Sequence, residues 1–372
     1  MKITRLETFL VQPRWLFLKV HTDKDIIGLG EPILEGRAKT VATAVQELEH
    51  LLIGEDPRRV QHLWQAMYRQ TFYRGGPLLT SAISGIEQAL WDILGKSLGA
   101  PVYQLLGGAC RDRIRMYRGA GGDTPEQAAA NVKDAIAQGF NALKTGVAKK
   151  GPIYIVDSPA TVEHAVEVFA AMREAAGKEV DIGIDFHGAI SPAMAKRLVT
   201  AYEPYEPFFF EEPVQCQNVD VLADIARSTS IPIATGERVF TKWGFREILE
   251  KQAASILQPD LSHAGGIMEC RFIAAMAECY YGSIAPHNPL GPISLAACLQ
   301  LAACTPNHLV QEHTTLGEGY LKEPFVLKDG YVDVPTGPGL GIELDEEALK
   351  ENLGHDWTNP RAFHKDGSVA DW

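Results

Sequence analysis

Three acidic residues recur at equal intervals in this chain, each where a short apolar run gives way to a polar turn. Asp185, Glu211 and Glu237 are the three, and each interval between them is 26 residues. A repeat of that length fits one strand, one helix and two short loops, which is the unit of a (β/α) barrel. Because parallel strands of a barrel carry their C-terminal ends to one face, the three carboxylates are expected to meet there. Like charges this close are unfavourable without a cation between them, which predicts a site for a hard divalent metal ion.

The chain is longer than a single barrel requires. It has 372 residues, of which 46% are hydrophobic, and it exceeds a minimal barrel by roughly a hundred residues, so we expect a second domain. The net charge of −12 argues against a nucleic-acid surface, because phosphate binding requires clustered Lys and Arg. An anionic substrate would then require a locally positive site.

The sequence carries no recognisable signal for export or for a membrane. It opens at Met1 directly into a strand-like run without an apolar signal region, and no stretch reaches roughly 18 uninterrupted apolar residues. The six cysteines form no CxxC pair and no zinc-like spacing, which indicates reduced thiols. We therefore expect a soluble, cytoplasmic protein that binds neither membrane nor nucleic acid.

The order of strand-like and helix-like runs at the two ends of the chain differs from that in its middle. Residues 3–32 alternate apolar and polar positions as in an antiparallel hairpin, whereas 39–52 and 83–94 repeat apolar residues at three- and four-residue steps, as in amphipathic helices. Strands followed by helices predict an α+β capping domain over residues 1–115. The segment 321–372 contains several Pro and Gly, and we expect it to pack back on this domain.

In residues 116–320 strand-like and helix-like runs alternate. Thr124-Pro125 and Ser191-Pro192 are typical helix starts, each with a capping side chain followed by a Pro at the first helical position. The predicted fold class is therefore α/β, a TIM-like (β/α)7β barrel, with the capping domain formed by the N-terminal region and the C-terminal tail. The expected strands are 114–117, 142–144, 181–185, 207–211, 231–236, 255–258, 283–286 and 309–311.

The later strand ends also carry ionisable residues at nearly the same interval. His287 follows Asp260 by 27 residues and Glu312 follows His287 by 25. His187 lies two positions after Asp185, on the same side of an extended strand. A single carboxylate at a strand end is more often a salt-bridge partner or a helix cap than a ligand, but three in step favour a metal site.

These motifs resemble a known family. The resemblance is to the enolase superfamily, in its mandelate racemase subgroup, and it spans the whole chain because Tyr73-Arg74-Gly75-Gly76-Pro77 is similar to the capping domain of that subgroup. Within the subgroup the chain is most similar to acid-sugar dehydratases. The barrel motifs that carry the resemblance are Asp185-Phe186-His187, Glu211-Glu212-Pro213, Gly236-Glu237-Arg238, Gln258-Pro259-Asp260, Ala285-Pro286-His287 and Gln311-Glu312.

The resemblance implies a cofactor, a substrate and an assembly. Asp185, Glu211 and Glu237 are expected to hold Mg²⁺, which would bind the carboxylate of a small acid sugar and offset the charge of an enediolate. The expected reaction is dehydration of D-galactonate to the 2-keto-3-deoxy acid. A large homo-oligomer, an octamer, is implied in the same way.

The resemblance also assigns the proton transfers. His287 is expected to remove the α-proton, with Asp260 hydrogen-bonded to its other ring nitrogen to fix the tautomer and raise its basicity. His187 is expected to protonate the leaving hydroxyl, because hydroxide is a poor leaving group. Glu312, protonated or hydrogen-bonded, would stabilise the enolate oxygen.

One motif departs from the pattern of relatives that use a lysine base. Those members carry a Lys-x-Lys pair at the second strand, whereas this chain has Lys144-Thr145-Gly146, which disfavours two opposed bases and with them racemisation. The loop 147–158 that follows is where we expect the substrate preference to be set. Arg14 and Arg74, on predicted loops of the capping domain, are candidate substrate contacts.

Other functions are also compatible with these motifs. The enzyme could dehydrate another aldonate or aldarate epimer, or it could be an acid-sugar epimerase. A sugar-acid binding or structural protein would keep the barrel without turnover, but it would have no need for both His187 and the pair of His287 and Asp260. His263 is interpreted as a loop residue and is left out of the candidate site.

Overall fold

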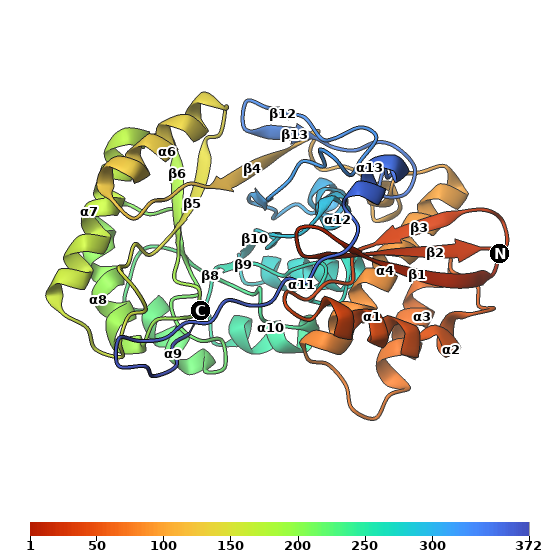
Figure 1. Cartoon of the computed structure of the whole chain (residues 1–372), viewed down its shortest axis with the longest axis horizontal. Coiled ribbons are helices and arrows are strands. Elements are labelled where there is room, and N and C mark those ends of the chain that lie inside the picture. The colour runs from red at the N-terminus through yellow and green to blue at the C-terminus, as the bar shows by residue number, and fades with distance from the viewer. Residues whose placement is uncertain (372) are drawn as a thin grey trace.

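The computed structural model describes residues 1–371, and its first part is a capping domain (Figure 1). Its antiparallel sheet contains β1 (Ile3–Val11), β2 (Trp15–Thr22) and β3 (Ile27–Gly30), with β2 in the middle. The helices that follow are α1 (Ala38–Glu47), α2 (Glu49–Leu52), α3 (Val60–Arg69), α4 (Pro77–Leu98) and α5 (Val102–Leu105). Helix α4 is buried over most of its length and lies between the sheet and the rest of the molecule.

Eight parallel strands form the barrel. They are β4 (Arg113–Gly119), β5 (Ala142–Gly146), β6 (Asp181–Asp185), β7 (Phe210–Glu211), β8 (Ile233–Thr235), β9 (Ile256–Leu257), β10 (Ser283–Ile284) and β11 (Gln311–Glu312). Neighbours pair in chain order from β4 to β10, and β11 pairs with β4. The ring closes where His308 bridges Ile284 in parallel, just before β11. The predicted (β/α) barrel is confirmed.

Helices connect these strands on the outside of the barrel (Figure 1). They are α6 (Pro125–Ala137), α7 (Pro159–Ala176), α8 (Pro192–Tyr202) with the short 3-10 turn Glu203–Tyr205, α9 (Val219–Ala226), α10 (Thr241–Glu250), α11 (Ile267–Glu278) and α12 (Pro292–Cys304). The predicted starts of two of them are confirmed. The Thr124 side chain accepts from the Gln127 N–H at 3.3 Å, and the Ser191 side chain accepts from the Met194 N–H at 3.2 Å.

The inside of the barrel is filled by side chains of alternate strand positions. Gly183, two residues before Asp185, leaves room for an aromatic ring, because a Cβ there would lie 2.6 Å from Phe209. The strand ends above this layer are thereby held at fixed positions. The layer consists of Tyr117, Ala142, Phe209, Ala234, Ile256, Ala285 and Val310.

Two buried carboxylates of the capping domain reach helix N-termini of the barrel. Glu31 accepts from two backbone N–H groups at the start of α12, at 2.7 and 2.9 Å, and Glu87 accepts from two at the start of α11, also at 2.7 and 2.9 Å. Burial raises the pKa of Glu31 to about 8 and that of Glu87 to about 7, although these hydrogen bonds oppose the rise. The positive end of each helix is therefore capped by a side chain of the other domain.

The C-terminal segment contacts both parts of the molecule. It contains β12 (Leu327–Lys328), β13 (Tyr331–Asp333) and α13 (Glu346–Glu351), and β13 pairs antiparallel with β4 of the barrel. Leu353 bridges Val11 of β1, and further on the His364 ring stacks on Tyr154 with 4.3 Å between ring centroids. The segment from Leu353 to His364 thus crosses from the capping domain to the barrel loops (Figure 1). In the described part of the chain, no helix has the length and apolar character of a membrane span.

Candidate active site

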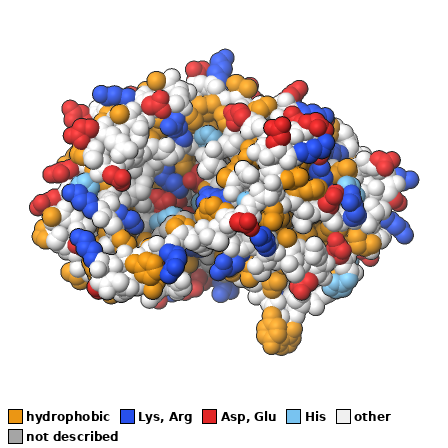
Figure 2. All heavy atoms as spheres, viewed as in Figure 1, with side chains coloured by type: hydrophobic (Ala, Val, Ile, Leu, Met, Phe, Trp, Pro, Cys, Tyr) orange, Lys and Arg blue, Asp and Glu red, His pale blue; other side chains and the backbone are white. Residues whose placement is uncertain are grey.

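Three carboxylates meet at the C-terminal ends of neighbouring strands. Asp185 ends β6, Glu211 ends β7, and Glu237 lies two residues after β8. One ligand oxygen from each lies within 4.8 Å of the others. The equal spacing in the sequence therefore does bring these residues together. In the space-filling view, the barrel half has a hollow that contains acidic, basic and His side chains (Figure 2).

The electrostatics of this cluster fit a cation. Burial and the charge of Asp185 raise the pKa of Glu211 well above its ordinary value. Burial also raises the pKa of Glu237, although His287 opposes the rise. Glu237 Oε2 is buried without a hydrogen-bond partner among the described residues. The three carboxylates repel one another, and one of their buried oxygen atoms accepts no hydrogen bond from a described residue. Such a set of oxygen ligands suits a hard divalent ion.

A lysine that sequence reasoning did not place in the site lies at its centre. Lys144 Nζ on β5 is 2.8 Å from Glu211 Oε1, 2.9 Å from Glu312 Oε1 and 3.4 Å from Asp185 Oδ2. Burial by itself would lower the pKa of Lys144, but Glu211 and Glu312 raise it well above the ordinary lysine value. The ammonium group therefore stays charged, which does not suit a base.

Other polar residues hold Glu211 and the neighbouring Glu212 in place by hydrogen bonds. The Gln258 amide donates to Glu211 Oε2 at 2.7 Å. Arg238 Nε donates to Glu212 Oε2 at 2.7 Å, and Glu212 Oε1 accepts from Thr235 at 3.1 Å. The motifs of the sequence contain these residues, but only the packing reveals which carboxylate each one holds.

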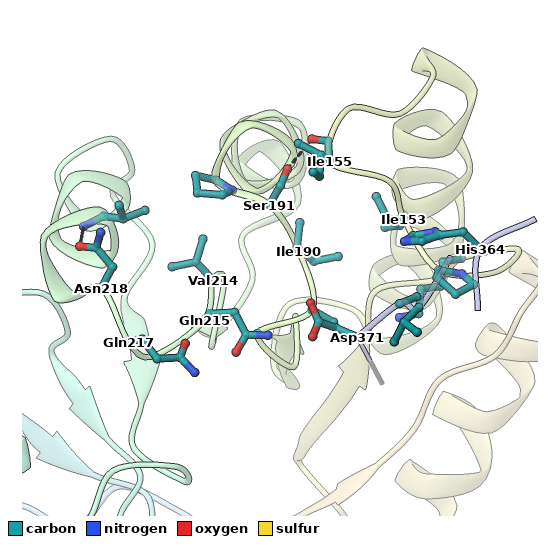
Figure 3. A pocket seen from close by; sticks show the side chains of 18 residues that line it. Ile153, Ile155, Ile190, Ser191, Val214, Gln215, Gln217, Asn218, His364 and Asp371 are labelled. Atoms are coloured by element: carbon teal, nitrogen blue, oxygen red, sulfur yellow. Dashed lines mark hydrogen bonds between the residues drawn. The ribbon is translucent and has the colours of Figure 1, made fainter. Parts of the chain in front are cut away.

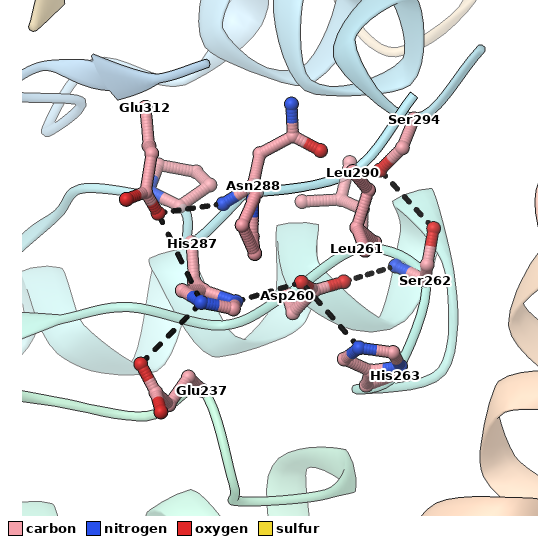
Figure 4. A network of polar contacts seen from close by, with 12 residues as sticks. Glu237, Asp260, Leu261, Ser262, His263, His287, Asn288, Leu290, Ser294 and Glu312 are labelled. Carbon is pink, nitrogen blue, oxygen red and sulfur yellow. Dashed lines mark hydrogen bonds and ion pairs between the residues drawn. The ribbon is translucent and has the colours of Figure 1, made fainter. Parts of the chain in front are cut away.

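His287 and Asp260 form a hydrogen-bonded pair. His287 Nδ1 lies 2.8 Å from Asp260 Oδ2, and the Ser262 N–H donates to Asp260 Oδ1 at 2.7 Å (Figure 4). The other ring nitrogen, His287 Nε2, is 3.4 Å from Glu237 Oε2 and 4.0 Å from Glu312 Oε2. Burial alone would lower the pKa of His287, but Glu237, Glu312 and Asp260 raise it well above its usual range. Nε2 therefore faces the carboxylate cluster.

Glu312 ends β11 beside this pair. Its Oε2 accepts from the backbone N–H of Asn288 at 2.9 Å (Figure 4). Burial would raise the pKa of Glu312, but Lys144 and His287 lower it to about 2. Of the two states expected from the sequence, the structure favours the hydrogen-bonded carboxylate over the protonated acid.

His187 emerges on the opposite side of the barrel from His287. It follows β6, whereas His287 follows β10, four places away in the ring of eight strands. The residue is exposed and has a left-handed backbone, with φ +57°. Its N–H donates to Asp185 Oδ1 at 2.7 Å, so the same turn orients a carboxylate of the cluster.

The two candidate arginines have different surroundings. Arg14 Nη2 donates to the Pro289 carbonyl at 3.3 Å, two residues beyond His287, and pairs with Glu35 at 3.2 Å. Arg74 donates to carbonyls of residues 69 and 71 at the end of α3 and in its own exposed loop. The structure thus brings Arg14 near the barrel mouth, but it does not bring Arg74 to the carboxylates.

A cavity of about 460 Å³ lies beside the site, between the loops after β5, β6 and β7 (Figure 3). The loop 147–158 contributes Ile153 and Ile155, the residues after His187 contribute Ile190 and Ser191, and the tail contributes His364. The segment in which we expected the substrate preference to be set therefore does face a cavity that adjoins His187.

Comparison with known families identifies the class to which this fold and site belong. Residues 6–107 match the model of the mandelate racemase / muconate lactonizing enzyme N-terminal domain, and residues 127–348 match the enolase C-terminal domain-like model. The chain belongs to the enolase superfamily, in its mandelate racemase subgroup. The predicted fold class and family are confirmed.

The individual relatives within this family are named as dehydratases. Proteins named D-galactonate dehydratase from Ralstonia nicotianae and Cronobacter sakazakii are 50% and 48% identical to this chain, over the full length of both sequences. A solved structure from Agrobacterium radiobacter, described as an enolase and candidate galactarate dehydratase with bound sodium and L-malate, is 31% identical with a TM-score of 0.93 and full coverage of both chains. Dehydratases of this kind are hydro-lyases, which agrees with the dehydration expected from the sequence.

Proposed function

We propose that this protein is a Mg²⁺-dependent hydro-lyase that converts D-galactonate to 2-dehydro-3-deoxy-D-galactonate and water. The observation that carries the proposal is the pair of imidazoles, His187 and His287, on opposite sides of a three-carboxylate cluster. The substrate follows from the curated relatives, which are named for D-galactonate and match the full chain at 50% identity.

Asp185, Glu211 and Glu237 are the residues that would hold the metal ion. When bound, a divalent cation supplies positive potential against the two negative charges of an enediolate. The donor set consists of hard oxygen atoms, which supports Mg²⁺ rather than a softer metal. The charged Lys144 adds positive potential at the same place, 2.8 Å from Glu211.

His287 is the base that removes the α-proton. Asp260 accepts the Nδ1 hydrogen, so Nε2 is the ring nitrogen directed at the carboxylate cluster. Glu237 and Glu312 raise the pKa of His287, and a divalent cation held by the cluster would offset their charge, which would leave Nε2 unprotonated and able to take the α-proton. The electron pair of the broken C–H bond then moves onto the substrate carboxylate, giving the enediolate. Lys144 remains protonated and position 146 is a glycine, so strand β5 supplies no second base and simple racemisation is disfavoured.

Elimination requires an acid on the other side. His187 donates a proton to the β-hydroxyl as the carbon–oxygen bond breaks, so that water leaves instead of hydroxide. The resulting enol takes up a proton at C3 and loses the proton of its C2 hydroxyl, which gives the 2-keto-3-deoxy acid. Because His187 is exposed, it can exchange its proton with solvent between turnovers.

Stabilisation of the enolate oxygen requires a hydrogen-bond donor. Ionised Glu312 cannot donate, but it holds Lys144 Nζ at 2.9 Å and can thereby direct the ammonium group towards that oxygen. We therefore assign the stabilising role to Glu312 and Lys144 together.

Arg14 is our candidate for a contact with the distal end of the sugar. A cavity of about 500 Å³ is lined by Arg14, Pro289, Thr314 and Trp357, beside the loop that carries His287. Arg74 has no comparable support, because its guanidinium donates to carbonyls of its own neighbourhood.

A screen of a stereochemically complete set of acid sugars tests the function. With enzyme and Mg²⁺, we expect D-galactonate to give the α-keto product faster than every other aldonate or aldarate. Preference for another epimer would correct the substrate, and inversion without water loss would indicate an epimerase. A binding protein would leave the α-proton unexchanged in D₂O.

Replacing His187 by Asn should separate the two proton transfers. Asn tolerates the left-handed backbone of this position, and the N–H that orients Asp185 is retained. We expect dehydration to fall by about 10²-fold or more while exchange of the α-proton persists. The two rates are measured together by NMR in D₂O; loss of both in parallel would contradict the assignment of His187 as the acid.

We also propose that the chain forms a homo-oligomer, an octamer by resemblance to its family. The loop between α3 and α4 projects from the capping domain with Phe72 and Tyr73 at 89% and 82% exposure, and an apolar projection is visible at the lower edge of Figure 2. Apolar side chains this exposed are typical of an interface. Light scattering of the purified protein should give eight times the chain mass of 40.7 kDa; a monomer would refute assembly.

A further inference from the structure

The carboxylate that orients His287 has a second imidazole beside it. His263 Nε2 lies 3.7 Å from Asp260 Oδ2, the same oxygen that accepts from His287 Nδ1 (Figure 4). This distance is an electrostatic contact rather than a hydrogen bond. Asp260 is fully buried and His263 is 4% exposed, so solvent does not screen the pair. The interpretation of His263 as an ordinary loop residue does not account for this position.

Helix α4 of the capping domain holds the far side of the His263 ring. Ser81 Oγ is 3.0 Å from His263 Nδ1 and 2.6 Å from the Pro77 carbonyl. A hydroxyl has one proton, and the carbonyl can only accept it, so the Ser81 oxygen accepts from Nδ1–H of His263. The ring orientation is thereby fixed, with Nε2 directed at Asp260. An attractive contact with the carboxylate requires a hydrogen on Nε2 as well, so it is the imidazolium form of His263 that can hold this carboxylate.

The turn that carries both residues is bound to the same helix. The Gln88 amide donates to the Leu261 carbonyl at 3.1 Å and to Ser262 Oγ at 3.2 Å. Glu87 caps the start of α11, where the turn ends. These groups are buried, and breaking one of their hydrogen bonds would leave an unsatisfied polar atom. The turn is therefore held firmly against α4.

We propose that His263 is a positioning residue for proton abstraction. Acting through Asp260, it keeps Oδ2 of this carboxylate on Nδ1 of His287, while Ser81 keeps His263 in place. Among the described residues, Oδ1 of this carboxylate accepts from the Ser262 N–H, whereas Oδ2 is contacted only by His287 and His263. The inference rests on the proposed function, because it concerns the base of that reaction.

Two substitutions of His263 test the idea. His263→Leu removes both polar contacts, whereas His263→Gln can still present an amide N–H to Asp260. We expect His263→Leu to lower kcat by about 10-fold at unchanged KM, on the scale of other outer partners of imidazoles, and His263→Gln to recover most of this loss. Slower proton abstraction should also enlarge the isotope effect of α-deuterated D-galactonate on kcat. A merely structural defect would reduce the active fraction and leave the isotope effect unchanged.

Ser81→Ala and Ser84→Ala form a matched pair of controls on α4. Ser81 contacts His263, whereas Ser84 accepts from the backbone N–H of Gly265 in the same turn at 2.9 Å. We expect Ser81→Ala to enlarge the isotope effect and Ser84→Ala to leave it unchanged. An equal rise in both variants would assign the effect to the turn as a whole and overturn the role of His263.

Crystal structures of the substrate-free wild type and His263→Leu give a readout that does not depend on turnover. We expect the 2.8 Å contact between Asp260 and His287 to lengthen or break in His263→Leu and to persist in His263→Gln. An unchanged contact together with an unchanged isotope effect would overturn the proposal. If the wild type dehydrated no acid sugar, the proposed function would fail, and the contact would still decide whether His263 positions Asp260.

Discussion

Replacing His287 by Asn is expected to abolish exchange of the α-proton and to lower kcat by about 10³-fold or more, within the range for loss of a general base. The Asn amide can occupy the place of Nδ1 and keep the hydrogen bond to Asp260. It has no atom at the place of Nε2, which faces Glu237 at 3.4 Å. The variant therefore removes the proton acceptor and preserves its support.

The measurement for His287→Asn is the appearance of deuterium at the α-carbon of D-galactonate in D₂O. His187→Asn is the control, because it should keep this exchange while losing dehydration. Mg²⁺-dependent thermal stabilisation of His287→Asn would show that the carboxylate cluster is intact. Exchange at the wild-type rate in His287→Asn would mean that another group is the base.

Replacing Glu237 by Gln should have the other large effect, on metal binding and on activity. The amide keeps the size of the side chain but lacks the charge of Glu237, whose Oε2 has no hydrogen-bond partner among the described residues. Loss of the metal ion removes several kcal/mol of transition-state stabilisation, so we expect kcat to fall by about 10³-fold. Isothermal titration with Mg²⁺ and turnover of D-galactonate measure the two losses.

Glu237→Gln should be more stable than the wild type without metal and less stable than the wild type with Mg²⁺. Without metal, removing one of three mutually repelling carboxylates should raise the melting temperature above that of the wild type. With Mg²⁺ at about 100 times its Kd, binding adds ~2.7 kcal/mol to the wild type and should reverse the order. Glu278→Gln, an exposed charge loss on α11, is the control. Equal Mg²⁺ shifts in wild type and Glu237→Gln would exclude Glu237 as a ligand.

The sequence allowed the barrel and its ring of polar strand ends to be predicted because the topology fixes both. Parallel strands of similar spacing must end on one face, so residues at equal intervals, such as Asp185 and Glu211, become neighbours without further information. The caps at Thr124 and Ser191 were readable for a similar reason, since each interaction spans three residues.

The residues that were missed depend on contacts between distant parts of the chain. Lys144 is 67 residues from Glu211, and its role follows from the direction of its side chain into the barrel. His263 is 182 residues from Ser81, and no local pattern relates the two. Arg74 donates to carbonyls at the end of α3 and in its own loop, and the sequence does not reveal whether an arginine makes such local contacts or reaches the carboxylates.

The carboxylates of Glu31 and Glu87 at the helix starts of the barrel have a consequence for truncation. A gene fragment that began after residue 112 would encode all eight barrel strands, yet it would expose the first turns of α11 and α12 as bare N–H groups. Those turns follow directly on the loops that carry Asp260 and His287. The amino-terminal part of this protein is therefore a built-in scaffold for the reacting groups, and the two parts cannot be exchanged between relatives as independent modules.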